Sequence, residues 1–141
     1  MATDGNDFSR SMGIATSGLR AQAARMRVIS ENIANADSTG QPAGGDPYRR
    51  KVPTFSSELD RTLDARVVTL GRVRPDASAF RIRYEPNNPA ADAAGNVKYP
   101  NVNSVVEMTD MRQAQRSYEA NLNIISATRR MIQRTLDILK A

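Results

Sequence analysis

The stretch that decides the fold is Ser104–Ala141, SVVEMTDMRQAQRSYEANLNIISATRRMIQRTLDILKA, which contains neither proline nor glycine. Mostly apolar residues recur along it at alternating spacings of three and four positions. This heptad pattern predicts a long helix. Ser104 and Glu107 have the spacing of a capping box, so we expect Ser104 to cap the helix and Glu107 to bond back to the cap amide. The heptad positions are Met108, Met111, Gln115, Tyr118, Leu122, Ile125, Arg129, Ile132, Leu136 and Leu139.

A second apolar stripe lies beside this heptad row and consists of Ala120, Ile124, Ala127, Met131 and Ile138. One partner helix covers one row, so two adjacent rows require two partners. The middle of the chain could fold back over the second stripe. We favour packing between molecules, because a lone pair of helices gains too little to offset the cost of ordering the chain.

The N-terminal segment, residues 7–36, also predicts a helix. Gly13 and Gly18 each cost about 1 kcal/mol relative to alanine, so the start of this helix should depend on packing. An antiparallel register that opposes Gln22 to Gln115 aligns the heptad rows of the two segments. The N-terminal row consists of Phe8, Met12, Ala15, Leu19, Gln22, Met26, Ile29, Ile33 and Ala36.

Residues 37–103 hold all seven prolines and five of the eight glycines, which break helices and mark turns. Residues 66–70 and 80–84 predict strands, and residues 48–55 predict an edge strand because Pro53 cannot donate to a ladder. Residues 41–46 and 86–96 are expected to be loops. The predicted fold class is mainly α, with a small β-containing middle and long terminal helices that pair as an antiparallel coiled coil. The segments are an N-terminal helix in 1–36, a middle with a small hairpin or sheet in 37–103, and a C-terminal helix in 104–141.

The amino-acid composition and motifs give no support for an enzymatic activity. The chain has no cysteine, histidine or tryptophan, which removes thiolate sites and the commonest general base. No phosphate-binding loop or metal-ligand spacing occurs. Asp60 and Asp64 could share a helical face, and Glu107 lies three residues before Asp110, but such carboxylate pairs are usually solvated. We expect no catalytic residue, cofactor or metal.

The formal net charge of +5 leaves nucleic-acid binding as an alternative from a different class. Arginine makes up 17 of the 20 basic residues, and several could form a basic stripe. No recognition motif accompanies them, and aromatic residues for base stacking are few. The N-terminal residues 1–11 lack an apolar signal core, and no apolar stretch approaches the ~20 residues of a membrane span. The arginines that could form the basic stripe are Arg20, Arg27, Arg129, Arg130 and Arg134.

The two ends of the chain carry specific motifs. Residues 17–22 and 25–36 (SGLRAQ and RMRVISENIANA) resemble the N-terminal signature of flagellar axial proteins, and residues 107–111 and 116–122 (EMTDM and RSYEANL) resemble their C-terminal signature. Residues 46–51 and 99–103 are most similar to the proximal members of the flagellar basal-body rod protein family. The chain departs from the family at Thr109 and Arg112, where apolar residues are usual or frequent.

This resemblance implies a structural subunit of the proximal rod, with both terminal helices in the inner, axial-core layer of a helical tube and the middle outside it. Head-to-tail contacts would extend the tube, which passes motor torque to the hook. The implied partners are further copies, other flagellar rod proteins, the connector protein between rod and MS ring, and the flagellar type III export apparatus. The implied location is the periplasm-spanning rod of the basal body, reached without a cleavable signal peptide. We expect neither a nucleic-acid partner nor direct membrane insertion.

The heptad rows and the matched motifs together give the candidate residues for helix packing and the subunit interface. We interpret the polar members as groups that hydrogen-bond between helices or subunits, with helix capping as the alternative for Asn35. The set is Met12, Leu19, Gln22, Met26, Ile29, Asn32, Ile33, Asn35, Met108, Met111, Gln115, Tyr118, Glu119, Asn121, Leu122, Ile125, Ile132 and Leu136.

Overall fold

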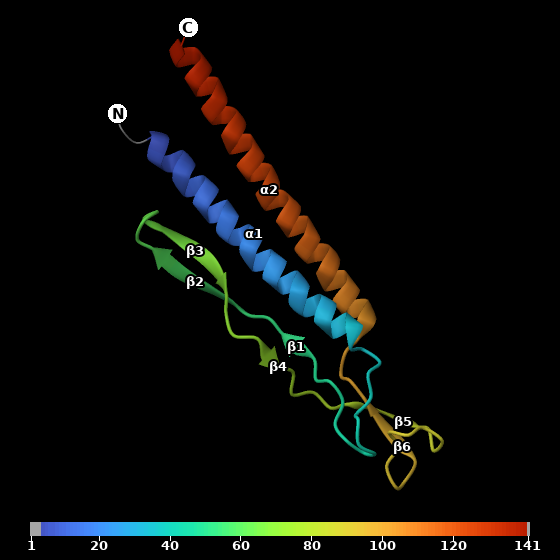
Figure 1. Cartoon of the computed structure of the whole chain (residues 1–141). Coiled ribbons are helices and arrows are strands. Elements are labelled where there is room, and N and C mark those ends of the chain that lie inside the picture. Colours follow the sequence, from blue (N-terminus) through green and yellow to red (C-terminus); the bar gives the residue numbers. More distant parts are fainter. Residues whose placement is uncertain (1–3, 141) are drawn as a thin grey trace. The chain divides into compact units, whose positions relative to one another are not determined.

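The computed structural model describes residues 4–140 and contains two long helices separated by short strands (Figure 1). The predicted mainly helical class with a small strand-containing middle is confirmed. Residues 1–3 and 141 of the predicted terminal segments lie outside the described residues. The elements are α1 (Asp4–Ala34), β1 (Lys51–Val52), β2 (Phe55–Asp60), β3 (Ala65–Leu70), β4 (Arg74–Pro75), β5 (Arg81–Tyr84), β6 (Asn96–Tyr99) and α2 (Ser104–Lys140).

The chain divides into two compact units, and each helix contributes to both. The first, here called the hairpin unit, comprises the described residues among 1–25, 55–71 and 113–141. The second, here called the network unit, comprises residues 26–54 and 72–112. Each unit therefore joins one part of α1 to one part of α2 through strands from the middle of the chain.

In the hairpin unit, β2 and β3 pair antiparallel from Phe55 opposite Leu70 to Asp60 opposite Ala65. The connecting turn closes when the Asp60 carboxylate accepts from the amide of Leu63 at 3.2 Å. Asp60 and Asp64 therefore belong to this turn and do not share a helical face. Short polar side chains stabilise turns in this way and tolerate the positive φ of 47° found at Asp64.

The hairpin is fixed to α1 within this unit. Arg10 donates from Nε to the carbonyl of Leu63 and from Nη2 to the carboxylate of Asp64, each at 2.9 Å. The amide of Val68 donates to the hydroxyl of Ser17 at 3.2 Å, so the edge of β3 lies against the helix. These contacts explain how an otherwise marginal two-stranded hairpin is held in place.

The two helices meet in the hairpin unit at Gly18 and Arg25 of α1. A Cβ built on Gly18 would lie 2.9 Å from the amide atoms of Asn121, and Arg25 donates to Gln113 at 3.4 Å. The contacted residue number rises along α1 and falls along α2, so the two helix segments are antiparallel here. The predicted register would have opposed Gly18 to Glu119, so the pairing of Gln22 with Gln115 is wrong.

The physical reason is the missing side chain at Gly18, which lets the amide of Asn121 approach the backbone of α1. Heptad counting treats each glycine only as a cost to helix stability and cannot register this approach. Gln115 is exposed, and the Oε1 atom of Gln22 is buried without a hydrogen-bond partner among the described residues.

In the network unit, two further antiparallel pairs form instead of one continuous sheet. β1 pairs with β4, with Lys51 opposite Pro75, and β5 pairs with β6, with Arg81 opposite Tyr99. Pro53 separates β1 from β2, which divides the predicted edge strand at 48–55 in two. The predicted loops at 41–46 and 86–96 touch where the amide of Gly44 donates to the carbonyl of Ala90 at 3.1 Å.

The helix ends in the network unit are capped by asparagines. Asn35 follows the last residue of α1, and its side-chain amide donates to the carbonyl of Glu31 at 2.8 Å. At the start of α2, the side-chain oxygen of Asn103 accepts from the amides of Val105 and Val106 at 3.1 and 3.4 Å. The predicted capping box is therefore wrong, because the cap lies one residue earlier.

No helix among residues 4–140 is long and apolar enough to cross a membrane.

Candidate functional site: a buried polar network and the faces of α2

Asn32, in the last turns of α1, lies at the centre of the network unit. It is 0% exposed and uses its full hydrogen-bonding capacity. Its side-chain oxygen accepts from the amide of Lys51 and from the hydroxyl of Tyr48, both at 2.9 Å. Its side-chain nitrogen donates to the carbonyl of Lys51 at 2.8 Å and to the carboxylate of Glu107 at 3.0 Å. One side chain thus joins α1, the strand β1 and the first turn of α2.

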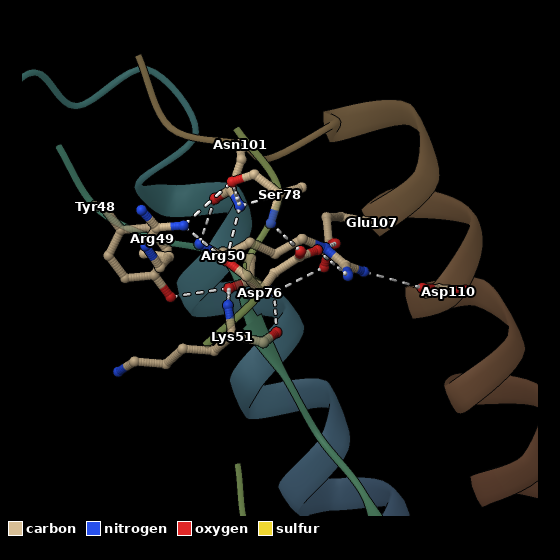
Figure 2. A network of polar contacts seen from close by, with 10 residues as sticks. Tyr48, Arg49, Arg50, Lys51, Asp76, Ser78, Asn101, Glu107 and Asp110 are labelled. Atoms are coloured by element: carbon tan, nitrogen blue, oxygen red, sulfur yellow. Dashed lines mark hydrogen bonds and ion pairs between the residues drawn. The ribbon is translucent and has the colours of Figure 1, made fainter. Parts of the chain in front are cut away.

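Glu107 is the buried acid of this network, with a side chain only 1% exposed. Its second oxygen accepts from Nε of Arg50 at 2.6 Å (Figure 2). Pairing and hydrogen bonding together make a buried charge tolerable, because isolated burial of a carboxylate is very costly. Sequence reasoning had interpreted Glu107 as a capping residue, and the Asn103 cap leaves its carboxylate free for this role.

Arg50 connects three carboxylates, two at the start of α2 and one just after β4. Besides Glu107, its guanidinium lies 3.4 Å from Asp76 and 3.9 Å from Asp110 (Figure 2). Asp110 was expected to be solvated, and it instead faces this cation. The planar guanidinium offers five donors in a fixed fork, which suits it to several acids at once. Since the carboxylates already surround a side-chain cation, the cluster has the character of a structural junction.

Neighbouring residues extend the junction to the strand β4 and the chain that follows it. The side-chain oxygen of Asn101 accepts from the amide of Arg50 at 2.8 Å, and its nitrogen donates to the hydroxyl of Ser78 at 2.9 Å. Arg49 donates to the carbonyl of Asp76 at 2.9 Å and lies 4.2 Å from the ring centre of Phe80. Such a cation–π contact adds about 0.5–1 kcal/mol where solvent reaches it.

The protonation equilibria reflect this surrounding. Burial raises the pKa of Tyr48 to about 12, and the carboxylates of Glu31 and Glu107 act in the same direction. The backbone amide of Ser78, then its hydroxyl and the Arg50 cation, hold the pKa of Asp76 below its ordinary value. Burial lowers the pKa of Arg50, but Glu107 and Asp76 outweigh it and the net direction is upward. Each shift stabilises the protonation state that the network requires at neutral pH.

Among residues 4–140, no group of three or more acidic side chains is arranged to hold a metal ion.

The buried and half-buried side chains that follow one another at helical spacing along α2 are here called the covered row. This row differs from the predicted heptad row at every second position. Ala114 and Thr128 are buried, as is Glu107, where the predicted row had Gln115, Arg129 and Met108. The small or polar residues at these positions explain why an apolar pattern missed them. The half-buried members of the predicted set on this helix are Met111, Tyr118, Asn121, Ile125 and Ile132.

The exposed side of α2 carries large apolar side chains on both flanks of the covered row. Met108, Leu122 and Leu136 lie on one flank, and the second stripe lies on the other. Glu119 and Gln115 are also exposed. The middle of the chain does not cover the second stripe within the described residues. Exposed apolar side chains on both flanks make α2 the candidate interaction surface of the described residues.

On α1, the structure buries Ile29 and Asn32 completely and leaves the other predicted residues half-buried. Sequence reasoning missed Tyr48, Arg50 and Asn101, because no periodic pattern marks residues in an irregular segment. The run of three basic residues Arg49–Lys51 at the start of β1 was a usable signal. Three adjacent cations at a strand indicate that acidic partners lie nearby in the fold. The predicted interface residues of the N-terminal segment that the structure leaves half-buried are Met12, Leu19, Gln22, Met26, Ile33 and Asn35.

Comparison with known proteins agrees with a structural role. The family described as "Flagella basal body rod protein" matches residues 12–40. The family described as "Flagellar basal body rod FlgEFG protein C-terminal" matches residues 93–138. Both helices therefore carry the features of flagellar basal-body rod proteins, which defines the class of this chain.

Full-length relatives specify the family further. The flagellar basal-body rod protein FlgC of Agrobacterium fabrum is 52% identical over 134 residues, covering 95% of this chain and 96% of the relative. FlgC of Aquifex aeolicus is 37% identical over 134 residues, covering 95% and 98%. FlgC of Bacillus subtilis is 37% identical over 145 residues, covering 92% and 97%. The chain belongs to the FlgC family of flagellar basal-body rod proteins. It is a structural subunit of the basal body and not an enzyme.

Proposed function

We propose that this chain is a subunit of the proximal rod that polymerises into a helical tube and transmits motor torque to the hook. The observation that carries the proposal is the double apolar surface of α2. Leu122 and Leu136 on one flank, and Ile124 and Met131 on the other, are each roughly half exposed in the isolated chain. Burying them against neighbouring subunits would supply about 25 cal/mol per Å² of apolar surface.

Within the subunit, we propose that α1 and α2 pair as an antiparallel coiled coil. The approach of Asn121 to Gly18 and the hydrogen bond from Arg25 to Gln113 support this pairing in the hairpin unit. The hydrogen bond from Asn32 to Glu107 supports it separately in the network unit. The covered row of α2 alternates small or polar residues with half-buried apolar ones, at the spacing of a coiled-coil row. The members are Glu107, Met111, Ala114, Tyr118, Asn121 and Ile125.

The buried network serves torque transmission by stiffness. Arg50 ties the middle segment to α2, and Asn32 ties it to α1, so load on any of these segments passes to the others through hydrogen-bonded side chains. Fully satisfied polar networks rigidify the structure around them. A subunit of a rod that transmits torque requires this stiffness more than it requires a large hydrophobic core.

The remaining members of the predicted interface follow from their exposure. Met108, Gln115 and Glu119 join Leu122 and Leu136 as candidate contacts between subunits, because the described part of the chain leaves all five exposed. We propose as partners further copies of the chain, other rod proteins and the connector protein between rod and MS ring. We also propose delivery to the periplasm-spanning rod by the flagellar type III export apparatus, which predicts loss of the chain from basal bodies when that apparatus is disabled.

Mass spectrometry of purified hook–basal bodies from the source organism tests the function. The chain should be present in a few copies and should resist washing in salt. Its absence from intact basal bodies would overturn the proposal.

A matched pair of variants tests the surface. Leu122→Glu should leave the helical circular dichroism of the purified chain unchanged, yet abolish incorporation and motility in a strain lacking its own copy. Leu122→Met keeps an apolar side chain at the same position and should be incorporated normally. Equal incorporation of both variants would show that the apolar flank of α2 is not an interface.

A further inference from the structure

The hairpin unit presents an apolar face on the β2–β3 hairpin in addition to those of α2. Side chains alternate between the two faces of a strand, so Phe55 and Leu59 share one face with Val68 and Arg66 of the opposite strand. Along β3, Ala65, Val67 and Thr69 are half-buried, whereas Arg66 and Val68 between them are exposed. On β3 the second face is therefore half-buried, while the first face is open on both strands.

This open face is built of large apolar groups. Leu59 is 61% exposed, and Phe55 and Val68 are also counted among the exposed large hydrophobic residues. Val68 pairs with Ser57 and so lies diagonally between Phe55 and Leu59. Diagonal neighbours across a hairpin lie about 7–8 Å apart, which makes the three side chains one surface. A two-stranded hairpin gains no stability from leaving such a surface in water.

We propose that the open face of the hairpin packs on the second stripe of α2 in a neighbouring copy of the same chain. This inference rests on the proposed function and names the two surfaces that meet. Both surfaces belong to every subunit and differ from each other. Their contact is therefore heterologous and propagates from copy to copy without closing, as growth of a rod requires.

The open face matches the C-terminal part of the stripe in length. From Phe55 to Leu59 the face spans about 13 Å at the rise of a β-strand. Met131 and Ile138 of the stripe lie about 11 Å apart at the rise of an α-helix. Charged or polar residues interrupt both apolar rows, Gln115 and Arg129 on the opposite flank and Arg134 between Met131 and Ile138. Ala127, one step before Met131, has a small side chain that allows a sheet to approach the helix closely.

Charge sets the direction of the contact. Arg66 lies opposite Leu59 near the turn of the hairpin, and it is exposed. On α2 the only exposed acid next to the apolar end of the stripe is Asp137, which precedes Ile138. Placing Arg66 against Asp137 puts Leu59 beside Ile138 of the neighbour. The same placement puts Phe55 beside Met131 of the neighbour.

Disulfide trapping tests this arrangement directly, because the chain has no cysteine of its own. Leu59→Cys and Ile138→Cys are placed on separate chains with different tags, which are produced together in a strain lacking the native copy. Basal bodies are purified and oxidised, and the proteins are separated without reductant. We expect a disulfide-linked heterodimer from this pair. Phe55→Cys with Met131→Cys is a second independent pair with the same expectation.

The exchanged pair is the matched control. Leu59→Cys with Met131→Cys uses residues from the two expected pairs, but offsets them by about 10 Å, whereas a disulfide requires Cα atoms within about 7 Å. A heterodimer from the exchanged pair would overturn the proposal, as would an adduct with a protein of different mass. Basal bodies that contain the variants but give no heterodimer from either expected pair would also overturn it. Absence of the chain from basal bodies would instead refute the proposed function.

Discussion

Replacing Asn32 by alanine tests whether the buried network holds the network unit together. The native side chain makes four hydrogen bonds, one of them to the charged carboxylate of Glu107. A neutral hydrogen bond contributes about 0.5–1.5 kcal/mol, a charged one about 1.5–3 kcal/mol, and buried partners left unpaired cost further free energy. Allowing for coupling among the four, we expect a loss of about 3–5 kcal/mol in the free energy of unfolding. That is a large part of the 5–15 kcal/mol typical of a domain.

Asn35→Ala is the matched control, because it is the same substitution three residues further along the chain. Asn35 makes one side-chain hydrogen bond, to the carbonyl of Glu31 at the end of α1. Its loss should cost about 1 kcal/mol. Urea unfolding of the purified chain, followed by circular dichroism, separates the two variants. With a typical slope, Asn32→Ala should lower the midpoint by about 2 M and Asn35→Ala by about 0.5 M. Equal midpoints would refute a network centred on Asn32.

Three further results are expected. Arg50→Met should destabilise the chain by about 3–5 kcal/mol because it strands the buried carboxylate of Glu107, and adding Glu107→Leu should recover part of that loss in the same urea assay. Gly18→Ala should destabilise by about 1–2 kcal/mol because its Cβ collides with the side chain of Asn121. In an Asn121→Ala background the same change should stabilise by about 1 kcal/mol through helix propensity, so an unchanged sign would contradict the close approach. The pKa of Tyr48 is raised to about 12 in the folded chain, so its contribution is complete below pH 10 and is lost as pH rises toward 12. The stability difference between the native chain and Tyr48→Phe should accordingly be constant up to pH 10 and shrink above it, and a difference that stays constant to pH 12 would exclude the raised pKa.

The two helices could be predicted because their signals are local. The segment from Ser104 onward lacks helix breakers, and its apolar residues recur at helical spacing, so the backbone conformation follows from neighbouring residues alone. The strand at 65–70 likewise follows from a run of β-branched residues ended by Gly71. β2 was missed because its sequence, FSSELD, has only two apolar residues, and its pairing depends on a turn held by Asp60.

The register of the helices could not be predicted for a different reason. Heptad counting places the largest apolar residues in the covered row, and it therefore chose Met108 and Leu122. In the structure Glu107, Ala114 and Asn121 take those positions, because the row must accommodate Gly18 and a polar junction. Met108 and Leu122 are exposed instead, so apolar periodicity alone does not identify the side of α2 that is covered within the chain.

The buried network was the least predictable feature. Asn32 and Glu107 were both singled out by motif resemblance, but their connection passes through Arg50, Tyr48 and the backbone of Lys51. These residues come from an irregular segment whose path is fixed only by tertiary contacts. No spacing rule relates residues so far apart in sequence.

Accessibility of a single position on α2 tests most directly the claim that its exposed face is an interface of the rod. A Met131→Cys variant is the only thiol in the chain and can be alkylated with iodoacetamide in three states: the free subunit, the purified basal body and the denatured chain. We predict rapid labelling in the free and denatured chains and protection in the basal body. Labelling in the assembled basal body at the rate of the free chain would contradict the account.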